Sequence, residues 1–233
     1  MSSSRGLWLS WAIVALLGGG IARADGEESV DCAREIAARV QARYDGVQDL
    51  EARFTQTSRS VAFGRAGQEL HASGIAVFAK PGRMRWTYEK PEPSVVVSDG
   101  QTLWLYDPKA REVQEFPVGQ GFLSGSAVQF LLGEGLILRD FEVRAEKCPS
   151  DTVRLLLTPK QDATYETLEL VVVAASGDVK GTAVVDLFGN RTEVMFESLQ
   201  LDRRPDPSSF RFQVEPGVKV LRAPSATGRD SSR

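Results

Sequence analysis

The sequence predicts a mainly β fold in which one antiparallel sheet, closed or strongly curled, is accompanied by short helices. Beyond Leu50 the side chains alternate with a period of two, the spacing that separates the two faces of a strand. Turn-forming residues such as Asp99-Gly100 interrupt this alternation at short intervals. Many short strands separated by turns are typical of a curled or closed sheet. After a first strand around Phe54, we expect strands near residues 70–79, 83–88, 94–98, 102–106, 112–116, 136–146, 152–158, 165–174, 179–187, 192–201 and 210–214.

One amphipathic helix precedes these strands. From Asp31 onward, four apolar residues recur at helical spacing, with the charged residues mostly elsewhere around the helix: Ile36, Ala37, Val40 and Tyr44. Asp45-Gly46 ends the predicted helix. A second helical fragment, Ala127 to Leu132, interrupts the strand pattern inside a glycine-rich stretch.

The first 24 residues have the pattern of a secretory signal peptide. Arg5 precedes an apolar stretch from Leu7 to Leu17, and Ala22-Arg23-Ala24 forms a cleavage site. A membrane anchor is the alternative, but the stretch is shorter than the roughly 20 apolar residues that a span requires. No cysteine directly follows the apolar stretch, so we expect a mature chain without its own lipid anchor and soluble. We expect one domain over residues 25–222 and a disordered tail over residues 223–233.

Composition and residue inventory argue against nucleic-acid binding and against catalysis. The net charge is −3, which gives no general attraction to nucleic acid or to anionic membranes. The single histidine, His71, lies in a predicted strand and is expected to face solvent, and no cysteine spacing suits a metal. We therefore predict no enzyme activity, no cofactor and no metal. Cys32 and Cys148 form either one disulfide or two buried thiols, since sequence does not give their separation.

The segment Arg83 to Tyr88 separates two kinds of side chain by strand alternation. Met84, Trp86 and Tyr88 share one face, and Arg83, Arg85 and Thr87 share the other. Core packing is the simplest interpretation of the apolar face. A curled sheet covered by only one or two short helices can instead leave this face as a binding surface, for which methionine is well suited.

Several motifs, in this order, resemble the LolA family of periplasmic lipoprotein carriers. The resemblance covers about residues 33–222. Its motifs are Phe54-Thr55-Gln56, Lys80-Pro81 before Met84-Arg85-Trp86, the hairpin from Val97 to Tyr106, the turn from Asp186 to Thr192, and the C-terminal Phe210-Arg211-Phe212 with Pro216 to Val220. Members of the family often carry arginine where this chain has Lys80.

The resemblance implies an incomplete antiparallel barrel with helices as a lid over a hydrophobic cavity. It also implies a monomeric periplasmic carrier that takes lipoproteins from an inner-membrane ABC-type complex and delivers them to an outer-membrane receptor. The expected cavity residues are Phe54, Met84, Trp86, Tyr88, Val96, Phe130 and Leu131. Strand register leaves open whether Leu103 and Leu105 or Trp104 and Tyr106 face inward, and we favour Trp104 and Tyr106. We expect Lys80, Arg83 and Arg85 at the cavity rim or in contact with partners.

Two other functions compete with the carrier. The lipid-anchored acceptor of the same pathway shares the fold but needs the lipidated cysteine that this sequence lacks. A periplasmic sensor that detects mislocalised lipoproteins with a similar barrel belongs to a different functional class. Co-purified lipoprotein would favour the carrier, and a stable complex with a membrane-bound regulator would favour the sensor.

Overall fold

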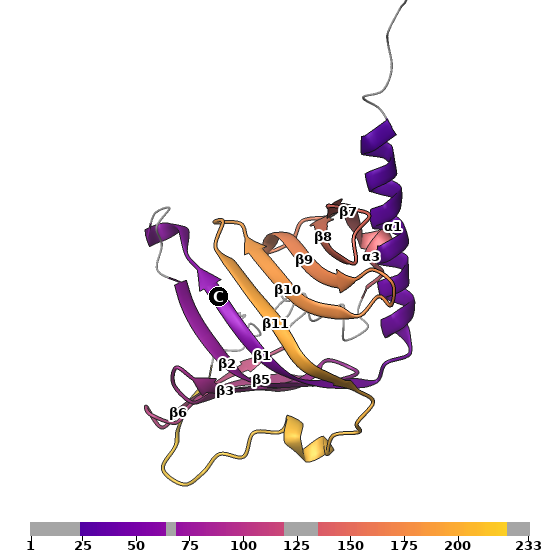
Figure 1. Ribbon diagram of the computed structural model, residues 1–233. Helices are drawn as coiled ribbons and strands as arrows, with labels where there is room; N and C mark the ends of the chain where they lie inside the picture. Colours follow the sequence, from indigo (N-terminus) through magenta and orange to yellow (C-terminus); the bar gives the residue numbers. More distant parts are fainter. Residues whose placement is uncertain (1–23, 64–68, 119–134, 223–233) are drawn as a thin grey trace, which may run out of the picture.

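The computed structural model describes residues 24–63, 69–118 and 135–222, and within them the protein is a single curled sheet of twelve strands (Figure 1). Each strand pairs antiparallel with its neighbours except β12, which runs parallel to β6. The order across the sheet is β12-β6-β5-β4-β3-β2-β1-β11-β10-β9-β8-β7, so β12 and β7 are its two edges. The predicted incomplete barrel is therefore confirmed, with one parallel pair at its edge.

The strands follow the predicted alternation closely. Their bounds are β1 Asp49–Arg59, β2 Glu69–Ala79, β3 Arg83–Lys90, β4 Ser94–Asp99, β5 Thr102–Asp107, β6 Glu112–Pro117, β7 Phe141–Glu146, β8 Thr152–Pro159, β9 Tyr165–Val173, β10 Val179–Asp186, β11 Arg191–Leu201 and β12 Lys219–Arg222. The helical segments are α1 Ala24–Asp45, α3 Ile137–Asp140 and the 3₁₀ turns η1 Val61–Phe63 and η2 Pro207–Phe210. The predicted fragment Ala127 to Leu132, the tail 223–233 and residues 1–23 of the predicted leader lie outside the described residues.

One predicted strand is wrong in part and another is wrong altogether. The strand expected from residue 136 begins as the short helix α3 and becomes extended only at Phe141. The strand expected at 210–214 is not paired with any strand. Pro207 and the Asp206 side chain, which accepts a hydrogen bond from the Ser208 amide, start η2 there instead.

The alternation of Phe210 and Phe212 has another cause. Phe210 is 1% exposed, and the Phe212 ring lies 4.9 Å from the Tyr106 ring, so both side chains pack against the sheet. The segment that carries them crosses the outside of the curl beneath β3 (yellow in Figure 1). Apolar residues with a period of two therefore indicate that one side of an extended segment is buried, and the segment does not need to pair with a neighbouring strand.

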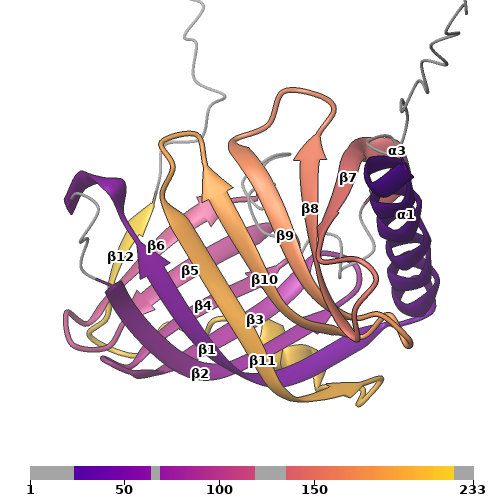
Figure 2. The same ribbon diagram turned by 45° about the horizontal axis from the view of Figure 1, so that its top comes forward.

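Helix α1 lies along the edge strand β7, on the side of the sheet opposite to η2 (Figure 2). It begins seven positions earlier than predicted, and its buried residues Ala33, Ile36, Ala37, Val40 and Tyr44 join the core. The Tyr44 hydroxyl accepts a hydrogen bond from the Val179 amide at 3.1 Å. A disulfide joins Cys32 to Cys148, whose Cα atoms are 6.1 Å apart. Among the described residues, α1 and α3 supply the helical cover, and they supply it at the β7 end of the sheet.

The outer face of the same half of the sheet, at β8, β9 and β11, carries a network of ion pairs. Glu169 lies between Arg154 and Arg191, with nitrogen to oxygen distances of 2.6 Å to each, and Glu193 contacts the same two arginines at 3.1 Å. Burial of the Glu169 carboxyl opposes its ionisation, but the hydrogen bonds from Arg191 and Arg154 outweigh this, and the pKa of Glu169 lies below its ordinary value. The network ties β8, β9 and β11 together across the sheet.

Candidate functional site

The concave face of the sheet carries a cluster of four aromatic residues. The Trp86 ring meets Phe54 edge to face with a centroid distance of 4.7 Å, and meets Phe78 in the same way at 5.3 Å. Tyr88 meets Phe54 at 5.2 Å. Edge-to-face pairs of this kind contribute about 0.5–1.5 kcal/mol each beyond the burial of their area. The cluster spans β1, β2 and β3.

The described members of the predicted cavity set mostly lie on this face. Strand pairing aligns Trp86 with Ala76 on one side and with Val96 on the other, and directly paired residues point to the same face. Phe54 and Met84 are 1% and 7% exposed. Trp86, Tyr88 and Val96 are only partly buried, although they pack against the same core. The concave face is therefore tightly packed at Phe54 and Met84 and partly accessible to solvent at Trp86, Tyr88 and Val96.

The prediction that Trp104 and Tyr106 face the cavity is wrong. Val96 pairs with Leu105 in the sheet, whereas Trp104 pairs with Val97, one residue away and on the opposite face. Leu103 and Leu105 contribute to the concave core, and Tyr106 packs outside against Phe212. On that outer face Phe212 packs against Tyr106, and η2 lies against β3 and β4.

Two further predicted residues, Phe130 and Leu131, lie outside the described residues. Several other residues of the core were not predicted from the sequence. Phe78 is fully buried and meets Trp86 edge to face, and Phe116, Phe141 and Tyr165 also pack in the core. The alternation of Ala76 and Phe78 along the predicted strand was the available signal. For the other three, their place in the core became evident only from the structure.

The three basic residues expected at the rim bind backbone carbonyls of this chain. Lys80 Nζ donates to the carbonyl oxygens of Tyr44 at 3.0 Å and Asp45 at 3.3 Å, so it stabilises the C-terminal end of α1. Arg83 donates to the Lys80 carbonyl at 2.6 Å and lies 5.3 Å above the Phe210 ring. Arg85 donates to the Ser209 carbonyl at 3.1 Å. These cations hold α1 and the C-terminal segment in place.

Uncharged polar side chains border the aromatic cluster on the concave face. The Tyr88 hydroxyl donates to Gln56 Oε1 at 3.1 Å, and Gln56 Nε2 donates to Ser58 Oγ at 3.2 Å. Ser58 Oγ lies 3.3 Å from Thr192 Oγ1. Burial raises the pKa of the Tyr88 phenol, so this hydroxyl stays protonated and able to donate near neutral pH.

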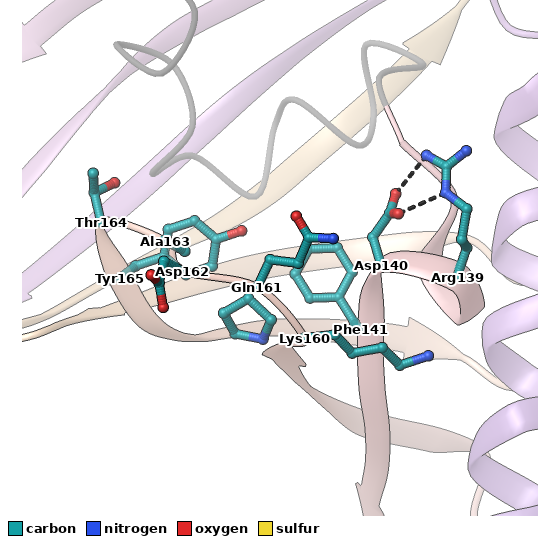
Figure 3. A pocket seen from close by; sticks show the side chains of 10 residues that line it. Arg139, Asp140, Phe141, Lys160, Gln161, Asp162, Ala163, Thr164 and Tyr165 are labelled. Carbon is teal, nitrogen blue, oxygen red and sulfur yellow. Dashed lines mark hydrogen bonds and ion pairs between the residues drawn. The ribbon is translucent and has the colours of Figure 1, made fainter.

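A pocket of about 670 Å³ opens beside α3, at the ends of β7, β8 and β9 (Figure 3). Phe141 and Tyr165 give it an apolar wall that continues the core, and Lys160 and Asp162 make the remainder polar. The Asp140 carboxylate is held by two hydrogen bonds from Arg139, which keep the pKa of Asp140 below its ordinary value. A carboxylate held ionised in this way does not provide the raised pKa of a general acid near neutral pH.

His71, expected to face solvent, is exposed, and the Thr57 hydroxyl lies 3.3 Å from its Nδ1. The part of the chain that the structure describes contains no group of three or more histidine, cysteine or acidic residues placed to hold a metal ion. Within the same residues, no helix is both long enough and apolar enough to cross a bilayer.

Comparison with known proteins identifies extended similarity. The family described as "Outer membrane lipoprotein carrier protein LolA" matches residues 45–213. An outer-membrane lipoprotein carrier protein from Chromobacterium violaceum is 30% identical over 185 residues, which cover 79% of this chain and 86% of that protein. Its counterpart from Methylibium petroleiphilum is 28% identical over 212 residues, covering 91% and 96%. A crystal structure of a LolA superfamily protein from Nitrosomonas europaea superposes with a TM-score of 0.44 at 12% identity, over 77% of this chain and 97% of that one. The family match includes the whole aromatic cluster.

Proposed function

Because the chain belongs to the LolA family of outer membrane lipoprotein carrier proteins, we propose that it carries lipoproteins through the periplasm by holding their acyl chains on the concave face. The observation that carries this proposal is the aromatic cluster of Phe54, Phe78, Trp86 and Tyr88, which is packed at its base and partly exposed at Trp86 and Tyr88. Acyl chains would extend this packing without any directional bond.

The physical need for such a carrier follows from the hydrophobic effect. Each methylene group of an acyl chain costs roughly 0.8 kcal/mol when it is exposed to water, so a lipoprotein with several chains does not cross an aqueous compartment unaided. Contact with a sheet face removes most of this cost, and non-directional apolar contact also permits release. The proposed activity is binding and transfer without a chemical step.

The proposal includes a route and two partners. The leader over residues 1–24 would direct the chain to the periplasm, where the mature domain over residues 25–222 would act as a monomer. An inner-membrane ABC-type complex would supply the cargo and an outer-membrane receptor would accept it. Lys80, Arg83 and Arg85 would contribute to these contacts only indirectly, because their cationic groups bind carbonyls within the chain.

Replacing Trp86 by glutamate tests the proposal. Trp86 is only partly buried, so a carboxylate at this position remains hydrated, while an acyl chain no longer finds an apolar surface. We expect Trp86→Glu to stay folded, as measured by circular dichroism and thermal melting, and to lose binding of a synthetic triacylated lipopeptide. Normal lipopeptide binding by a folded Trp86→Glu protein would refute the role of this face.

Thr87→Glu is the matched control. Thr87 is the next residue of β3, is also partly buried, and points to the outer face. The same charge on the same strand should leave lipopeptide binding unchanged. If both variants lose binding equally, the effect comes from destabilised β3 and the cluster is not the site.

A further inference from the structure

The concave face changes character along its strands. On β1 the inward residues run from Phe54 to Gln56 and then to Ser58, and on β11 they run from Phe196 to Val194 and then to Thr192. Phe54 and Phe196 are buried, whereas Gln56, Ser58 and Thr192 are half-buried. An apolar base thus gives way to polar side chains at the end of the sheet where β1 ends and β11 begins.

These polar side chains form one connected belt. Tyr88 on β3, Gln56 and Ser58 on β1, and Thr192 on β11 are linked by hydrogen bonds of 3.1, 3.2 and 3.3 Å. Among the described residues, none of the four side chains is hydrogen-bonded to a charged group. The belt therefore has members on β3, β1 and β11 and forms a row of neutral donors and acceptors beside the aromatic cluster.

Gly74 on β2 makes the link between β3 and β1 possible. Gly74 pairs with Phe54 on one side and with Tyr88 on the other, so it lies between the two side chains. A Cβ atom at this position would lie 2.0 Å from the Thr87 carbonyl oxygen, a distance that backbone atoms do not allow. Because β2 presents no side chain there, the Tyr88 ring reaches across it to contact Phe54 and its hydroxyl reaches Gln56.

We propose that this belt, Tyr88-Gln56-Ser58-Thr192, binds the ester and amide groups at the head of the acylated cysteine, while the acyl chains lie on the aromatic cluster. The inference rests on the proposed carrier function and adds the orientation of the cargo. Ester and amide carbonyls accept hydrogen bonds, and hydroxyl and carboxamide groups donate them. The four side chains are partly accessible, so they exchange hydrogen bonds among themselves for hydrogen bonds to the cargo.

The neutrality of the belt gives it a selectivity. A lipid phosphate placed against it would lose part of its hydration and gain no counter-charge from these four residues, which is unfavourable. The uncharged glyceryl ester and amide groups of a triacylated cysteine lose much less hydration free energy in the same position. The belt therefore favours lipoprotein over a phospholipid with identical acyl chains.

Two substitutions that remove single hydroxyl groups test the belt. Tyr88→Phe keeps the aromatic ring, and Thr192→Val keeps the size and β-branching of the side chain. We expect each to weaken binding of a synthetic triacylated lipopeptide by about three- to tenfold, and the double variant to weaken it further. Binding of the apolar dye N-phenyl-1-naphthylamine, which needs only the aromatic cluster, should stay unchanged in Thr192→Val, because Thr192 lies outside that cluster.

Thr57→Val is the control, because Thr57 is the neighbour of Gln56 and Ser58 but its hydroxyl lies on the outer face beside His71. It should bind lipopeptide like the unmodified protein. If the unmodified protein does not bind the lipopeptide at all, the carrier function itself fails. If the unmodified protein binds the lipopeptide and the double variant binds it equally well, the proposed role of the belt is refuted while the carrier function stands. Equal affinity of the unmodified protein for the lipopeptide and for phosphatidylglycerol with the same chains would overturn the selectivity.

Discussion

The disulfide between Cys32 and Cys148 should contribute a large part of the stability of this protein. It joins α1 to the turn between β7 and β8, across 116 positions of sequence. In the chain-entropy treatment, closing a loop of this length removes enough freedom from the unfolded chain to stabilise the fold by at most about 5 kcal/mol. For a domain of this size, that corresponds to a melting temperature higher by about 10–20 °C. The double variant Cys32→Ser with Cys148→Ser should melt lower than the oxidised protein by an amount approaching this range.

Differential scanning calorimetry with and without reducing agent measures the effect. Reductant should lower the melting temperature of the unmodified protein towards that of the double variant, and should leave the double variant itself unchanged. Mass spectrometry after alkylation under non-reducing conditions counts the free thiols independently. Two free thiols in the isolated protein would show that the bridge does not form. An unmodified protein whose melting temperature does not change with reductant would show that the bridge does not stabilise the fold.

Three further substitutions test particular contacts. Glu169→Gln should lower the melting temperature at pH 7. Because the pKa of Glu169 is lower in the folded protein than in the unfolded chain, its contribution to stability is complete above the unfolded pKa and disappears as the pH falls through the folded pKa. The difference in melting temperature between the variant and the parent should therefore shrink in melts taken from pH 7 to pH 3. Phe78→Ala, at a fully buried position against Trp86, should cost about 3–5 kcal/mol in urea unfolding, and a cost below 1 kcal/mol would contradict its place in the cluster. Lys80→Met should lower stability by about 1 kcal/mol by releasing the last carbonyls of α1, and Lys80→Arg should retain it; equal melting of all three proteins would exclude this role.

Local pattern was sufficient for most of the fold. The period of two predicted the strands from β1 to β11, because a strand with one buried side has alternating apolar and polar residues in its sequence. The helical spacing from Asp31 to Tyr44 identified the buried side of α1 for the same reason. The ordered motifs added the family, and with it the incomplete barrel.

The site was predictable to a smaller extent. Met84, Trp86 and Tyr88 could be grouped because they alternate within one strand, and the grouping of Phe54 with them came from the family resemblance. The belt that joins Tyr88 to Gln56, Ser58 and Thr192 could not be found in the sequence, because its members come from three strands whose register is set by pairing. Gly74, which lets Tyr88 reach β1, could not be distinguished from other strand glycines for the same reason.

The sequence by itself determined which residues alternate, where most strands and α1 lie, and that the chain has one apolar sheet face to bury. Only the tertiary structure decided which side of β5 faces inward. The pairing of β5 with β4 places Trp104 and Tyr106 outside, and Phe212, about a hundred residues later, packs against Tyr106 there. It likewise decided that Cys32 meets Cys148 and that Lys80, Arg83 and Arg85 bind carbonyls of this chain. The physical reason is that alternation is a property of neighbouring residues, whereas burial of a given face depends on which distant segment packs against it.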